Sequence, residues 1–88
     1  MRDVKEIIEM LMSVVAGGEA TRAEVEELDF EADEALQPIL DETFIKLLVF
    51  AFDHDERIRD PVRDEAMRRE LDRLLNEIAR LAANGDAT

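Results

Sequence analysis

The most reactive-looking stretch of this chain is Asp53-His54-Asp55-Glu56, which contains its only histidine. His54 could act as a general base oriented by a carboxylate, or it could bind a metal ion together with Asp53 or Glu56. Metal hydrolase sites built on histidine pairs need a second histidine, and the sequence has none. Because the helix dipole also favours a histidine at a helix C-terminus, we interpret this stretch as a solvated helix end.

A second pattern of acids, Glu31-x-x-Glu34 and Asp53-x-x-Glu56, invites comparison with all-α enzymes that bind magnesium through acidic pairs on helices. If both pairs lie on one helix, Glu34 and Asp53 are roughly 28 Å apart at 1.5 Å per residue, so a shared site would need two chains. The candidate metal ligands of such a metal-dependent hydrolase are Glu31, Glu34, Asp53, His54 and Glu56. The sequence specifies no cofactor, and we favour a protein that is not an enzyme.

The elements that position these residues are organised around residues 43–52, which hold three of the four phenylalanines and one charge, Lys46. A helix that is apolar all the way round must be covered on several sides. Asp33 is a good N-cap upstream, and the apolar stripe continues to Ile58. The pattern therefore predicts a long central helix over about 33–58.

Helices are also predicted on both sides of this one. Residues 2–16 show apolar residues at helical spacing, and Gly17-Gly18 ends that helix. Asp60-Pro61 joins a preferred N-cap to a favoured first position, so a third helix is expected over about 61–83, with Asn84-Gly85 as its stop. Its apolar seam repeats at alternating four- and three-residue spacing and consists of Met67, Leu71, Leu74, Ile78 and Leu81.

The segment 19–32 has two interpretations. Thr21-Arg22-Ala23-Glu24 matches a capping box and predicts a short fourth helix at about 22–28. Its many acids favour an extended loop instead. In either case we expect Phe30 to pin the segment to the core.

Together these elements predict an all-α fold, in which residues 1–88 form a single helical domain. It is a small three-helix bundle with a long central helix (about 33–58) and an antiparallel third helix (about 61–83), with or without the short helix at about 22–28. A connection of one to three residues makes the last two helices antiparallel neighbours, and the first helix covers the remaining side of 43–52.

Two single-stripe helices leave one side of 43–52 bare, unless the 19–32 segment folds over the gap with Val25, Leu28 and Phe30. A bare patch of this kind exceeds what monomers tolerate. We therefore expect a twofold homodimer. Its interface would contain Phe44, Leu48, Phe50 and Phe52.

The formal charge of −12 is unevenly placed, because residues 19–42 carry ten acids and one base. This charge argues against binding nucleic acid or an anionic membrane. The arginines of 57–80 alternate with acids in local pairs such as Glu65–Arg69, Glu70–Arg73 and Glu77–Arg80, which indicates a solvated helix face. A further interpretation docks the acidic segment near these arginines, within or between chains.

The absence of cysteine excludes disulfides and thiolate metal sites and fits a cytoplasmic protein. No signal sequence and no run long enough to span a bilayer is recognisable. The function we expect is helix-mediated protein–protein contact and self-association. The alternatives are an acidic nucleic-acid mimic that inhibits a basic protein partner, and the metal-dependent hydrolase described above.

Overall fold

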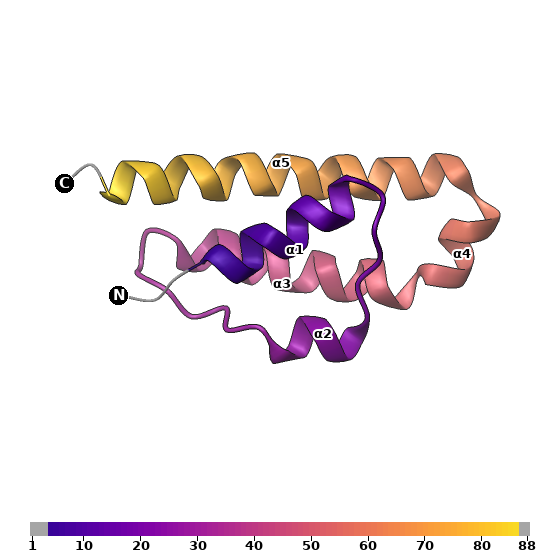
Figure 1. Cartoon of the computed structure of the whole chain (residues 1–88), viewed down its shortest axis with the longest axis horizontal. Helices are drawn as coiled ribbons and strands as arrows, with labels where there is room; N and C mark the ends of the chain where they lie inside the picture. Colours follow the sequence, from indigo (N-terminus) through magenta and orange to yellow (C-terminus); the bar gives the residue numbers. More distant parts are fainter. Residues whose placement is uncertain (1–3, 87–88) are drawn as a thin grey trace.

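The computed structural model describes residues 4–86, and the side chains of residues 4–83. Within this range the chain forms helices and no strands: α1 (Lys5–Val15), α2 (Arg22–Glu27), α3 (Gln37–Phe52), α4 (His54–Arg59) and α5 (Pro61–Asp86). The long helices α1, α3 and α5 pack against one another as a small all-α bundle, which confirms the predicted fold class. Helices α3 and α5 run antiparallel, and α4 turns the corner between them (Figure 1).

Helix α1 buries one stripe and ends at the predicted glycines. Ile7, Leu11 and Val14 are fully buried or nearly so. Gly17 takes a φ of 110°, which side chains other than hydrogen rarely tolerate, so the chain can leave the helix and turn back.

The segment 19–32 folds over α3. The capping box is present, since the Thr21 hydroxyl accepts a hydrogen bond from the Glu24 amide and the Glu24 carboxylate accepts one from the Thr21 amide. Val25 is fully buried. Phe30 packs edge-on against Phe44, with ring centroids 5.0 Å apart. This confirms the short helix and its covering role.

The helices that lie against α3 therefore differ from those predicted. The backbone of α1 lies close to α5, and it is α2 that approaches α3. Side chains of α1 still join the same core as those of α3, but the side of α3 assigned to the first helix is shared with α2 and the connection that follows it.

The central helix is not continuous over 33–58, and this corrects the prediction. It begins at Gln37, where the side chain accepts a hydrogen bond from the Ala32 amide and donates one to the Phe30 carbonyl. It ends at Phe52, and α4 starts anew at His54. The Arg57 Nε donates to the Phe50 carbonyl at 3.1 Å. In an unbroken helix that carbonyl would accept a hydrogen bond from the His54 amide. At the break, the Arg57 side chain supplies a donor in place of that amide.

Helix α5 begins where predicted. The Asp60 carboxylate accepts a hydrogen bond from the Arg63 amide at 3.2 Å, and Pro61 is the first helical residue. Leu71, Leu74 and Ile78 of the seam are buried. The predicted stop at Asn84-Gly85 is wrong, because α5 runs through both residues to Asp86.

Helix α3 contributes most of its circumference to the core. Leu40, Leu47 and Phe50 are completely buried, as is Thr43, whose hydroxyl donates to the Ile39 carbonyl at 2.7 Å. A buried hydroxyl is tolerated when it is hydrogen-bonded in this way. None of the helices in the described part of the chain has both the length and the hydrophobicity that crossing a bilayer requires.

Leu47→Ala tests the central position of α3. We expect a loss of about 2–5 kcal/mol in the free energy of unfolding, because the substitution leaves a cavity in a closed core. Ile45→Ala on the same helix is the control, since Ile45 is exposed and its truncation should change stability by about 0.5 kcal/mol or less. Chemical denaturation at low chain concentration measures both, and equal losses would contradict the observed orientation of α3.

Candidate functional site: a charge network and an open apolar face

Asp53 and His54 are engaged by partners from other segments, and Glu56 by a neighbour in its own helix. Asp53 accepts a hydrogen bond from the Arg63 Nε at 2.6 Å, and Glu56 pairs with Arg59 at 3.3 Å. The His54 Nδ1 lies 3.2 Å from a carboxylate oxygen of Glu19. These contacts bind each side chain to a neighbour and do not gather the acids around a common point.

The other candidate ligands, Glu31 and Glu34, lie in the connection between α2 and α3. This connection is at the opposite end of α3 from Asp53 (Figure 1). The two acidic pairs are therefore not brought together within one chain. Among the described residues, no group of three or more histidine or acidic side chains is arranged to hold a metal ion.

The structure assembles a different constellation, the Arg57 network, from Glu19, Arg57, Asp64 and Arg68. The Arg57 side chain is only 1% exposed. Its guanidinium donates to Glu19 at 2.7 Å and to Asp64 at 2.7 Å, and its central carbon lies 3.4 Å from the centroid of the Phe50 ring. A buried guanidinium is tolerated only when charge partners and hydrogen bonds replace its hydration, and here they do.

Arg68 extends the network to α1. It donates to the Val14 carbonyl at 2.6 Å and to the Gly18 carbonyl at 2.7 Å. It also donates to Glu19 at 2.8 Å and to Asp64 at 2.9 Å. The last carbonyls of a helix have no partner within it, so Arg68 satisfies the end of α1 while holding the connection to α2 against α5.

The carboxylates of the network are held ionised. A hydrogen bond from Arg57 is the main reason why the pKa of Glu19 falls from 4.5 to about 2, against the opposing effect of burial. Hydrogen bonds from Arg68 and then Arg57 lower the pKa of Asp64. Carboxylates neutralised by arginines in this way are poor proton acceptors, so the arrangement is suited to cross-linking the fold and not to acid–base catalysis.

The sequence pattern suggested a solvated arginine face, and this is correct for Arg69, Arg73 and Arg80. Their predicted partners are the observed ones, Glu65, Glu70 and Glu77. It is wrong for Arg57 and Arg68, which are largely buried. The docking of the acidic segment near these arginines was the more accurate interpretation, since Glu19 binds Arg57 and Arg68 and Glu42 binds Arg73.

The second feature is an apolar face on α3, formed by Ile45, Val49 and Phe52, which are 59%, 46% and 67% exposed. Their spacing of four and three residues places them on one side of the helix. The guanidinium of Arg22 lies 5.3 Å from the centroid of the Phe52 ring. About half or more of each of these three side chains is therefore left open to solvent.

The predicted interface residues are divided between two environments. Phe50 is completely buried beneath Arg57, so its surface is not available to a second chain. Phe44 and Leu48 are partly buried and pack against the core. Only Phe52 of the four lies on the open face. Ile45 and Val49 were missed, although their spacing from Phe52 could have identified them.

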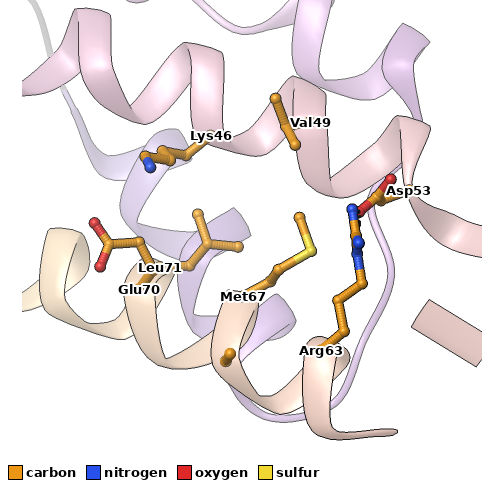
Figure 2. A pocket seen from close by; sticks show the side chains of 8 residues that line it. Lys46, Val49, Asp53, Arg63, Met67, Glu70 and Leu71 are labelled. Carbon is orange, nitrogen blue, oxygen red and sulfur yellow. Dashed lines mark hydrogen bonds and ion pairs between the residues drawn. The ribbon is translucent and has the colours of Figure 1, made fainter. Parts of the chain in front are cut away.

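A groove of about 290 Å³ lies between α3 and α5 and continues this face. Val49, Met67 and Leu71 lie in its middle, with Lys46 and Glu70 at one end and Asp53 and Arg63 at the other (Figure 2). The groove is thus apolar in the middle and carries one charge of each sign at either end.

No protein-family model matches this chain, and no characterised protein and no solved structure shows significant similarity to it.

Arg57→Ala tests the structural role of the network. We expect a loss of about 3–5 kcal/mol in the free energy of unfolding, because Glu19 and Asp64 lose a buried partner. Arg59→Ala is the matched control, since its side chain is exposed and pairs only with Glu56 in the described structure. That control should change stability by about 0–1 kcal/mol in urea denaturation. Similar losses for both variants would contradict the cross-linking role.

Glu19→Gln tests the electrostatics. Because the pKa of Glu19 is depressed to about 2 in the folded chain, its contribution is present above the unfolded value near 4.5 and is lost as the pH falls toward 2. Wild type should exceed the variant by about 1 kcal/mol at pH 6, after discounting for solvent screening of this partly exposed carboxylate. The difference should vanish near pH 2. Glu27→Gln, an exposed carboxylate of α2, should follow wild type throughout.

Proposed function

We propose that this protein acts through helix-mediated protein–protein contact, and that the contact is self-association through the open apolar face of α3. The observation that carries the proposal is the exposure of Ile45, Val49 and Phe52 on one side of a helix whose opposite side is buried in the core. Aligned apolar side chains of this size on a folded surface are typical of interaction sites.

The arrangement of the face supports a second copy as its occupant. Ile45 and Phe52 lie seven residues apart, with Val49 between them, which is about 10 Å along the helix. A twofold axis through Val49 and perpendicular to α3 would place Ile45 of one copy against Phe52 of the other. The face would then be complementary to itself, as an isologous dimer requires.

The acidic surface supports a nucleic-acid mimic less well. Several carboxylates of the segment 19–42 are used within the chain: Glu19 by Arg57 and Arg68, Glu26 by Arg22 and Glu42 by Arg73. A mimic needs carboxylates that are free to bind a basic groove.

A cytoplasmic location is part of the proposal, since a chain without cysteine needs no oxidising compartment.

Phe52→Asp is the direct test. Sedimentation equilibrium at micromolar concentration should show dimers for the wild type and monomers for the variant, with an affinity loss of at least about tenfold, because a charge is expelled from an apolar contact. Circular dichroism should remain helical, since Phe52 contributes little to the core.

Val62→Asp is the matched control. Val62 is 77% exposed, lies on the opposite side of α5 from buried Leu71 and does not line the groove. Its variant should dimerise as the wild type does. A wild type that is monomeric at about 100 µM would overturn the proposal, and so would a Phe52→Asp variant that still dimerises. If the protein instead bound a basic partner, the affinity of that complex would fall steeply as salt is added. The affinity of a dimer held by apolar contacts should not.

A further inference from the structure

The two ends of the groove between α3 and α5 carry charges in opposite order. At one end α3 contributes the base Lys46 and α5 the acid Glu70. At the other end α3 contributes the acid Asp53 and α5 the base Arg63, and these two form an ion pair. Lys46 and Asp53 of α3 are seven residues apart, and so are Arg63 and Glu70 of α5. The two residues from the same helix therefore lie on the same side of it, nearly two turns apart.

This order is complementary to itself. A half-turn about an axis through the middle of the groove, perpendicular to α3, exchanges its two ends. Lys46 is carried onto the position of Asp53, and Arg63 onto that of Glu70. Each base of one copy would meet an acid of the other, and the Val49 and Met67 side chains of the two copies would meet at the centre (Figure 2).

We infer that the groove is the recognition surface for a second copy of this chain, bound antiparallel so that Lys46 meets Asp53 of the partner copy and Arg63 meets its Glu70. This inference rests on the proposed self-association and adds the partner's orientation and the residues that select it. A half-turn about an axis parallel to the helices would also pair opposite charges, Lys46 with Glu70 and Asp53 with Arg63, but it would lay α3 of one copy on α5 of the other. The exposed apolar faces of the two α3 helices would then not meet, so the antiparallel arrangement alone satisfies both the charges and the apolar faces.

The state of Lys46 supports this assignment. Lys46 is the only base on α3 and is exposed, and no described side chain forms an ion pair with it. The other three groups have partners within their own chain but stay partly accessible: Arg63 and Asp53 have side-chain exposures of 51% and 19% in their pair, and Glu70, paired with Arg73, is 36% exposed. Ion pairs of this kind add little affinity when exposed, but they determine which orientation of two apolar faces is accepted.

Mixing two charge variants tests the orientation. In the inferred dimer, Lys46→Glu alone sets the new carboxylate against Asp53 of the other copy at both symmetric contacts. Asp53→Lys alone sets the new ammonium group against Lys46 of the other copy, again at both contacts. Each variant by itself should therefore dimerise about tenfold more weakly than the wild type. In an equimolar mixture, one contact of the heterodimer joins the two new side chains and the other joins the two native ones. Both contacts then pair opposite charges, so near wild-type affinity should return.

Arg69→Glu is the control for net charge. It makes the same charge change as Lys46→Glu on an exposed residue of α5 outside the groove, and it should weaken dimerisation much less. Fluorescence anisotropy of a labelled copy measures every combination, and circular dichroism confirms that each variant is folded. If Asp53→Lys unfolds, the mixture of Lys46→Glu with wild type decides. The inference predicts that the heterodimer of Lys46→Glu with wild type has an affinity between those of the wild-type and Lys46→Glu homodimers. The reason is that only one of its two contacts is repulsive.

The outcomes distinguish the antiparallel orientation from self-association itself. If Phe52→Asp abolishes the dimer but the mixture of charge variants gives no recovery, the apolar contact stands and the antiparallel orientation is overturned. If Lys46→Glu binds wild type more tightly than wild type binds itself, Lys46 lies against Lys46 of the other copy and the inference is wrong. If the wild type does not dimerise, both the inference and the proposed function fail.

Discussion

The buried guanidinium of Arg57 is the constraint on which the rest of the structure depends. Arginine stays charged inside a protein, so every donor it places in the interior needs an acceptor. Its partners come from three separate segments: the Phe50 carbonyl in α3, Glu19 in the connection after α1, and Asp64 in α5. Satisfying one side chain therefore brings together parts of the chain that are 7 to 38 residues away from it.

The break between α3 and α4 follows from the same contact. By taking the Phe50 carbonyl, Arg57 ends α3 and lets α4 turn toward α5 (Figure 1). Phe50 lies under the guanidinium in the core. Phe52, two residues later, is rotated by about 200° around the helix and points outward. The core and the open apolar face are thus two sides of one helix.

How much of this could be predicted depended on whether the signal was local. The capping box at Thr21, Gly17 after α1 and the Asp60-Pro61 start of α5 act over a few residues, and all were correct. The stop at Asn84-Gly85 was a local signal that failed, because a single glycine costs a helix only about 1 kcal/mol and need not end it. The break at Asp53 has no local signal, since its cause is the Arg57 side chain and the neighbours that hold it.

By itself, the sequence determined the all-α class, the number of long helices and the stripes they bury, since apolar spacing and caps are properties of short segments. Only the tertiary structure decided which side of α3 remained open. Ile45, Phe50 and Phe52 are all hydrophobic, and composition cannot rank them. Their fate depends on where α2 and Arg57 come to lie, because burial is set by neighbours distant in the chain.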